Sequence, residues 1–148
     1  MAKAPADPAA VFAANQQRAA PLLKALRADG IGHRIDGDLV AASSGESFET
    51  TSPIDGSVLA SVARGTKDDI DKAAKAAQRA FKDWRDMAPA ARRKLLHRIA
   101  DAIEDHADDI ATLECIDTGQ AWRFMSKAAV RGAENFRFYA DRCLEARD

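Results

Sequence analysis

Gly65-Thr66-Lys67-Asp68-Asp69 opens the stretch that decides the fold, and Leu113-Glu114-Cys115-Ile116-Asp117-Thr118-Gly119 closes it. Thr66 is placed to accept the amide of Asp69 as a helix cap, and the early acids suit the positive helix end. Gly119 can adopt the left-handed backbone conformation that commonly ends a helix. Between these ends the apolar residues recur at helical spacing, with a break at Pro89. We therefore predict helices over residues 67–84, 89–106 and 108–118.

The first of these helices carries a continuous apolar stripe. Its members are Ile70, Ala73, Ala74, Ala77, Phe81 and Trp84. A stripe of this spacing is typical of a helix that packs one face against a core. We interpret residues 65–119 as scaffold, because no catalytic constellation is visible in them.

The residues before this stretch divide into two parts. Residues 1–6 are predicted to be a loose tail, and Asp7-Pro8 is a typical helix start. The helix that follows should be kinked or split at Pro21 and should end at Gly30. Because its apolar stripe is weak, we interpret residues 1–32 as an N-terminal helical extension.

Residues 33–64 have the pattern of short antiparallel strands. Asp36-Gly37 lies between two short strand-like runs and tolerates the positive φ angles of a tight hairpin turn. Residues 48–52 and 58–63 are further strands, separated by a turn at Pro53-Ile54-Asp55-Gly56. We therefore expect three or four short strands in this region.

A last helix is predicted over about residues 122–144. The chain is thus expected to be helix-rich, of the α+β class, with a few short N-terminal antiparallel strands. Its 148 residues are enough for one domain with a real core. The helices nevertheless present more apolar surface than a few short strands can cover, so we expect further sequence to cover them.

Charge and cysteine content exclude several classes of protein. The net charge is −1, from 22 Lys and Arg against 23 Asp and Glu. The chain therefore lacks the excess of positive charge that binds nucleic acid or an anionic membrane. The two cysteines lack CxxC spacing, which argues against a disulfide framework or a zinc site. No apolar run is long enough to span a membrane, and the N-terminal residues lack the apolar core of a secretory signal. A cytoplasmic location is the simplest interpretation.

The candidate nucleophiles and bases are weak. Cys115 lies near a predicted helix C-terminus beside Glu114 and Asp117, all of which disfavour a thiolate, so both it and Cys143 are predicted to be small buried apolar residues. The three histidines, at positions 33, 97 and 106, show no metal-ligand spacing. No phosphate-binding glycine motif occurs. We therefore predict no catalytic and no cofactor-binding residues in this chain.

Arg131 and Arg137 alternate with aromatic residues in the last helix. The simpler interpretation is an amphipathic helix with an Arg–Glu pair. The alternative is that Arg131, beside the small Gly132, binds an anion through a forked guanidinium. The sequence leaves both interpretations open.

Several short segments, in order and at the right spacing, resemble the N-terminal part of the NAD(P)-dependent aldehyde dehydrogenase superfamily. They are Ile35-Asp36-Gly37, Thr50-Thr51-Ser52-Pro53-Ile54-Asp55-Gly56, Asp71-Lys72-Ala73 through Trp84, Arg92, Leu95-Leu96, Leu113-Glu114 and Asp117-Thr118-Gly119. Ser52 stands where the family usually has Asn. Residues 114–120 and 134–140 are most similar to the branch that oxidises muconate-type semialdehydes, exemplified by the 5-carboxymethyl-2-hydroxymuconate semialdehyde dehydrogenases of aromatic-compound breakdown.

The resemblance implies a fold and a function. Residues 33–148 would be the incomplete N-terminal part of a cofactor-binding domain in an α/β fold, within a longer homodimeric or homotetrameric enzyme that uses NAD. The catalytic cysteine, the base and the cofactor motif of the family lie outside this chain. By resemblance, Thr50, Thr51 and Asp117 would bind a monovalent cation, and Arg131 would contact the semialdehyde substrate.

Two other interpretations stay open. The chain could belong to an aldehyde dehydrogenase of another substrate class, including a CoA-acylating one. It could also be a non-catalytic helical interaction domain that kept the scaffold. The sequence of the chain alone does not separate them.

Overall fold

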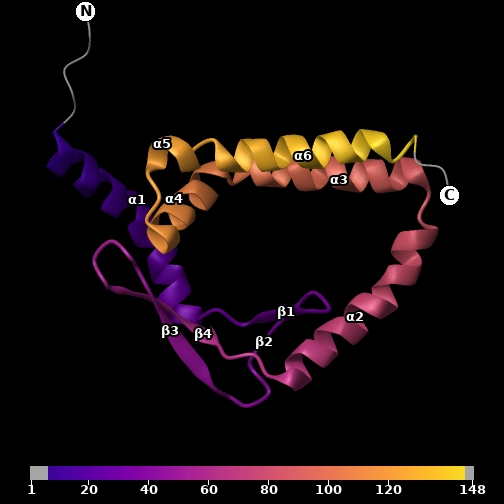
Figure 1. Cartoon of the computed structure of the whole chain (residues 1–148), viewed down its shortest axis with the longest axis horizontal. Helices are drawn as coiled ribbons and strands as arrows, with labels where there is room; N and C mark the ends of the chain where they lie inside the picture. The colour runs from indigo at the N-terminus through magenta and orange to yellow at the C-terminus, as the bar shows by residue number, and fades with distance from the viewer. Residues whose placement is uncertain (1–6, 146–148) are drawn as a thin grey trace, which may run out of the picture.

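The computed structural model describes residues 7–145, as an open frame of helices and short strands (Figure 1). The elements in chain order are α1 (Pro8–Asp29), β1 (His33–Ile35), β2 (Asp38–Val40), β3 (Ser47–Thr51), β4 (Val58–Ala63), α2 (Lys67–Asp86), α3 (Pro89–Asp105), α4 (Ala107–Thr118), α5 (Trp122–Met125) and α6 (Ala128–Arg142). The predicted helix-rich fold with short antiparallel strands is confirmed. The tail predicted for residues 1–6 lies outside the described residues.

The first helix begins as predicted and continues further than predicted. Asp7 caps α1 by accepting the amide of Ala9 at 3.2 Å, and Gly30 ends the helix with φ 66°. Of the two effects expected at Pro21, a kink or a split, the split is wrong, since α1 runs through Pro21. Pro21 is exposed, and a proline removes only one backbone hydrogen bond, so the helix-forming alanines and leucines around it sustain the helix.

The strands form two separate hairpins. The strand β1 pairs antiparallel with β2, and Asp36 and Gly37 between them both have positive φ, at 58° and 88°. The strand β3 pairs antiparallel with β4, with a register irregularity between Thr50 and Thr51. Both hairpins were predicted, because their turn residues and alternating strands are local signals.

The helix starts and stops between residues 65 and 119 are also confirmed. Thr66 and Asp69 form a capping box at the start of α2, and Gly119 ends α4 in the left-handed conformation with φ 74°. The chain then departs from the prediction, because the single helix expected over residues 122–144 is divided into α5 and α6. At the break the amide of Lys127 donates to the carbonyl of Phe124, three residues back, which tightens the turn.

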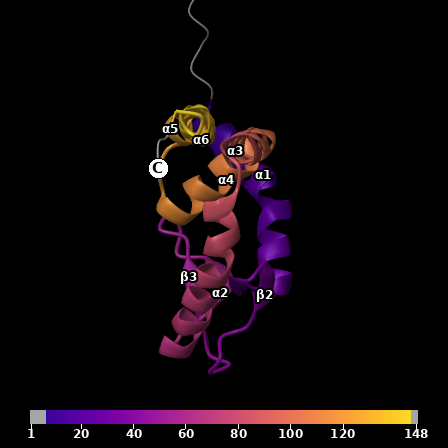
Figure 2. The ribbon, with the colours of Figure 1, turned by 90° about the vertical axis from the view of Figure 1, so that its right-hand side faces the viewer.

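The helices are unevenly packed. The helices α3 and α6 lie antiparallel and side by side along one edge of the frame, as both views show (Figures 1 and 2). The helix α2 connects the strand region to α3 as a strut, and its main contact with another element is with β1. The helix α1 packs against β4 and α4.

The core is small: it is less than a chain of 148 residues can bury, and it agrees with the expectation that the helices present more apolar surface than the short strands can cover. Among the described residues no large side chain is fully buried, and most of the buried apolar residues are alanines. The predicted apolar stripe of α2 instead faces solvent, with Ile70 at 69% and Phe81 at 57% exposed. The physical reason is that no described element packs against this face of α2.

None of the helices described between residues 7 and 145 is both long and apolar enough to cross a membrane.

Candidate functional sites

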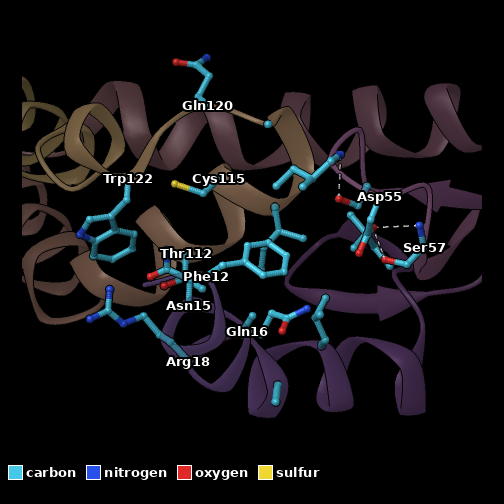
Figure 3. Close-up of a pocket in the computed structure, with 18 of the residues that line it drawn as sticks. Phe12, Asn15, Gln16, Arg18, Asp55, Ser57, Thr112, Cys115, Gln120 and Trp122 are labelled. Carbon is cyan, nitrogen blue, oxygen red and sulfur yellow. Dashed lines mark hydrogen bonds between the residues drawn. The ribbon is translucent and has the colours of Figure 1, made fainter. Parts of the chain in front are cut away.

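A large cavity, of about 940 Å³, lies between α1, the β3–β4 hairpin and α4 (Figure 3). Phe12, Leu23, Leu59 and Ile116 contribute apolar side chains to its walls. Polar side chains also line it, among them Asn15, Gln16, Arg18, Asp55, Thr112 and Gln120. A concave, mostly apolar site with a few polar groups can receive either a ligand or another part of a protein.

The helix α1 forms one wall of this cavity and is attached at two points. At one point the guanidinium carbon of Arg18 lies 4.2 Å from the centre of the Trp122 ring, at the start of α5. At the other, Nη2 of Arg27 donates to the carbonyl of Val58 at 2.7 Å. Residues 7–29 therefore pack on the scaffold and shape its cavity.

Cys115 lines the cavity but is poorly suited to act as a nucleophile. Burial and the neighbouring Glu114 raise the pKa of its thiol above the ordinary value. No hydrogen bond or ion pair joins Cys115 to a base within residues 7–145. Cys143 donates from Sγ to the carbonyl of Tyr139 at 3.4 Å, at the end of α6. Both cysteines are half-buried, which corrects the prediction that they are buried: Cys115 lies on α4, which has an open side, and Cys143 directly follows the end of α6.

Asp69 is the buried charged group of the scaffold. Its carboxylate accepts hydrogen bonds from the amide and hydroxyl of Thr66, both at 2.9 Å, and from the amide and hydroxyl of Ser43. The hydroxyl of Ser43, followed by the amide of Thr66, holds the pKa of Asp69 well below its usual range. The arrangement connects the loop after β2 to the start of α2, which is a structural role.

The residues with a predicted cation role lie on two neighbouring segments. Thr50 and Thr51 flank the register irregularity of β3, and Asp117 is exposed in the last turn of α4. A Cβ built on Gly119 would lie 3.2 Å from Cγ of Pro53, so the end of α4 touches the turn after β3. The hydroxyl and carboxylate oxygens of these segments are ligands of the kind that monovalent and other hard cations prefer.

The turn between β3 and β4 is itself well ordered by hydrogen bonds. Oδ1 of Asp55 accepts the hydroxyl of Ser57 at 2.7 Å and its amide at 3.0 Å, and these bonds lower the pKa of Asp55. The amide of Ser52 donates to the carbonyl of Ser57. These hydrogen bonds hold the conformation of the turn that contains Pro53, against which Gly119 lies.

Arg131 and Arg137 have different surroundings on α6. Arg137 donates to both oxygens of Glu104, at 2.7 and 2.9 Å, and to Asp101 at 2.7 Å, both on α3. Arg131 is exposed, and no side chain within residues 7–145 forms an ion pair with it. The Arg–Glu pair expected within the last helix is replaced by a bond between helices for Arg137, and the guanidinium of Arg131 is open to a ligand.

The histidines each lie beside a carboxylate. Nε2 of His97 is 3.0 Å from Oδ1 of Asp141, and His106 and His33 lie 3.8 and 4.0 Å from Asp109 and Asp69. No group of three His, Cys, Asp or Glu side chains able to hold a metal ion occurs in the described part of the chain.

Sequence reasoning missed the polar contacts between α3 and α6. Besides the contacts of Arg137, Oδ1 of Asp141 on α6 accepts from Nε of Arg93 on α3 at 2.8 Å. The sequence did contain a signal for these contacts. On α3, two basic side chains one turn apart are followed by two acidic ones, namely Arg93, His97, Asp101 and Glu104. Pairing them required knowing that α6 lies antiparallel beside α3.

Comparison with known proteins gives a consistent result. The family model described as "Aldehyde dehydrogenase family" matches residues 39–148. "Aldehyde dehydrogenase 1" of Tanacetum cinerariifolium is 44% identical over 111 residues, which cover 72% of this chain and 22% of that protein. "NADP/NAD-dependent aldehyde dehydrogenase PuuC" of Escherichia coli is 40% identical over 110 residues, again covering 72% of this chain and 22% of that protein.

Two solved structures extend the comparison to the fold. HpcC from Thermus thermophilus matches with a TM-score of 0.82 and 38% identity, over 86% of this chain and 25% of that one. An indole-3-acetaldehyde dehydrogenase matches with a TM-score of 0.81 and 32% identity, over 92% of this chain and 31% of that one. Residues 33–148 make up less than four-fifths of the chain, so a match over 92% of it includes part of residues 1–32. The chain spans about a fifth to a third of the length of these proteins.

Proposed function

The chain belongs to the aldehyde dehydrogenase family, and we propose that it is the N-terminal scaffold of a longer enzyme that oxidises a semialdehyde to its acid. The family match over residues 39–148 carries this proposal. The longer enzyme would be cytoplasmic and would act as a homodimer or homotetramer. The substrate we propose is a carboxylated semialdehyde of the muconate type, from aromatic-compound breakdown.

The residues between 7 and 145 would support the reaction without performing its chemical step. Cys115 has a raised thiol pKa and no base beside it, so it does not fit the role of the nucleophile. NAD, when bound by the longer enzyme, would accept the hydride. This chain contributes no glycine-rich phosphate cradle.

The substrate proposal depends on Arg131. Its guanidinium is exposed on α6, whereas the nearby Arg137 is already engaged by Asp101 and Glu104. A planar guanidinium binds a carboxylate through two parallel hydrogen bonds, which selects a charged substrate over a neutral one.

We also propose that Thr50, Thr51 and Asp117 hold a monovalent cation at the edge of the large cavity. The contact between Gly119 and Pro53 supports it, since it places the end of α4 against the turn that follows Thr51. The irregularity between Thr50 and Thr51 adds support, because a bulge takes a backbone group out of the strand ladder.

Substitution of Arg131 in the complete enzyme tests the substrate proposal. Arg131→Ala should raise KM for a carboxylated semialdehyde roughly ten- to a hundredfold, which corresponds to a loss of about 1.5–3 kcal/mol. An uncharged aldehyde of similar size should be little affected, and Arg131→Lys should restore only part of the affinity. Equal losses for the charged and uncharged substrates would reject the assignment of Arg131 to the carboxylate.

Thermal stability in different salts tests the cation proposal. Sodium or potassium should raise the melting temperature of the complete enzyme above that in N-methylglucamine at the same ionic strength, because a bound ligand stabilises the folded state. Asp117→Asn should remove this difference. Asp108→Asn, at the opposite end of α4, is the control and should keep it. A difference that survives Asp117→Asn would place the cation elsewhere.

A further inference from the structure

The contact between α3 and α6 contains two charge clusters of opposite polarity. In the first, Arg137 of α6 donates to Asp101 and Glu104 of α3 at 2.7–2.9 Å. In the second, Asp141 of α6 lies 2.8 Å from Arg93 and 3.0 Å from His97 of α3. The two clusters lie one turn apart along α6. Each helix therefore contributes basic side chains to one cluster and acidic side chains to the other.

The most deeply buried apolar side chains of these two helices are small. Ala133 and Ala140 of α6 and Ala100 of α3 are completely buried, and Ala129 of α6 is 5% exposed. Alanines let two helices approach closely, but a methyl group interlocks only weakly with the opposing groove. The polar clusters are therefore the most directional contacts between α6 and α3.

Arg137 is the side chain best able to fix the rotation. Its guanidinium is half-buried and binds two carboxylates, one of them through both oxygens. Such a planar fork restricts direction as well as distance. Glu104 and Asp101 raise the pKa of Arg137, and Arg137 in turn lowers the pKa of Glu104.

Arg131 lies on the other side of the same helix. At ~100° per residue, Arg131 is two residues from both Ala129 and Ala133 and so lies about 160° from each around the axis of α6. It therefore points away from α3, which agrees with its exposure. A rotation of α6 on α3 would change the direction of Arg131 by the same angle.

We propose that Arg137 is a positioning residue, which fixes the rotation of α6 against α3 and thereby directs Arg131 toward the carboxylate of the substrate. The role of Arg131 in this proposal rests on the proposed function. The role of Arg137 in fixing the rotation of α6 does not. Arg137 does not touch the substrate. Its loss should allow α6 to adopt several rotations in which Arg131 points in different directions.

A distance measurement between spin labels tests the rotation directly. In the complete enzyme, with Cys115→Ala, Cys143→Ala and its remaining cysteines replaced, labels are attached through Arg131→Cys on α6 and Arg98→Cys, an exposed position on α3. Pulsed electron paramagnetic resonance should give one narrow distance distribution. Adding Arg137→Ala should broaden or shift it, and Arg137→Lys should have an intermediate effect.

Two further variants make the test decisive. Arg142→Ala is the matched control, because Arg142 pairs with Glu145 and not with α3, so the distribution should stay narrow. Glu104→Gln replaces Arg137→Ala if circular dichroism shows that the latter does not fold, and it should broaden the distribution less, since Asp101 remains. An unchanged distribution in every folded variant of this contact would overturn the proposal.

Kinetics of the complete enzyme give the second readout. Arg137→Ala should raise KM for the carboxylated semialdehyde roughly threefold to tenfold, less than Arg131→Ala, and leave kcat and the KM for the uncharged aldehyde close to those of the parent. Equal changes for both substrates would overturn the positioning role. Failure of the proposed function would be recognised separately, since Arg131→Ala would then show no selectivity while the distance result stands on its own.

Discussion

Gly119 and Pro53 lie against each other, so that a Cβ on Gly119 would come within 3.2 Å of Cγ of Pro53. This contact joins the end of α4 to the turn after β3, where the predicted cation residues lie. Gly119 also has φ 74°, a region that L-residues with a side chain enter only at a cost. Backbone conformation and close approach therefore require glycine at this one position.

Replacing Gly119 should destabilise the chain, and replacing Gly132 should not. Gly119→Ala is expected to lower the free energy of unfolding by about 1–2 kcal/mol because of its positive φ, with some further loss from the contact with Pro53. Gly132→Ala is the control, since it lies inside α6 with no atom near the added methyl group, and it should stabilise by about 0.5–1 kcal/mol. Thermal melts followed by circular dichroism measure both. Equal effects of the two substitutions would contradict the left-handed conformation of Gly119.

Asp69 should make the stability of the chain depend on acid pH. Its folded-state pKa is lowered by Ser43 and Thr66, so its contribution is present above about pH 4, the pKa of an unfolded Asp. The contribution shrinks as pH falls from there toward the lower folded-state pKa. Asp69→Asn should therefore lower the melting temperature by several degrees at pH 7 and by much less in strong acid.

Asp68→Asn is the matched control for this prediction. Asp68 precedes Asp69 in the first turn of α2 but is exposed and makes no side-chain hydrogen bond to another residue of the described range. It should change the melting temperature only slightly, through the helix dipole. A similar loss for both variants would show that the capping network of Asp69 contributes nothing specific.

Cys115 should react slowly with alkylating reagents and support no turnover. Its pKa is raised by burial and then by Glu114, so the thiolate needed for reaction forms only at higher pH than for a free thiol. In a Cys143→Ala background, Glu114→Gln should speed the reaction with iodoacetamide at a fixed pH near 8. We also expect no NAD reduction with any aldehyde by the 148-residue chain. Turnover that Cys115→Ala abolishes would contradict both expectations.

The exposed stripe of α2 should bind a hydrophobic dye. Ile70, Phe81 and Trp84 are exposed by 69%, 57% and 37%, and a broad, weakly cooperative melt should accompany dye binding by the 148-residue chain. Phe81→Gln should reduce the dye signal with little effect on the melt, because Phe81 packs against little. Leu59→Ala, at a site only 4% exposed, should instead lower the melting temperature. A sharp transition without dye binding would show that the chain closes its own core.

The sequence by itself determined the local elements of this protein. The turn at Asp36-Gly37, the capping pair Thr66 and Asp69, the break before Pro89 and the stop at Gly119 all depend on residues within a few positions of each other. Short-range sterics and backbone hydrogen bonds decide such features, so a pattern in the sequence is enough to predict them. The family resemblance followed from the order of short segments, among them Ile35-Asp36-Gly37 and Asp117-Thr118-Gly119.

Local rules failed where two local signals competed. Pro21 predicted a split that the surrounding helix-forming residues overrode, and the tight turn at Lys127 divided a helix whose apolar spacing is continuous. The apolar stripe of α2 was recognised correctly as a stripe. The sequence also predicted more apolar helix surface than the strands can cover, but not which helix would leave its stripe exposed, because burial depends on which other element lies opposite.

Only the tertiary structure decided which faces meet. Arg137 finds its partners 33 and 36 residues earlier in the chain, and Arg27 finds the carbonyl of Val58 31 residues later. Arg131 and Arg137 have the same side chain and lie six residues apart, yet one is engaged and the other is open. The reason is geometric: the pairing of α3 with α6 brings one side of α6 against acidic residues and leaves the opposite side exposed, and no local pattern specifies that pairing.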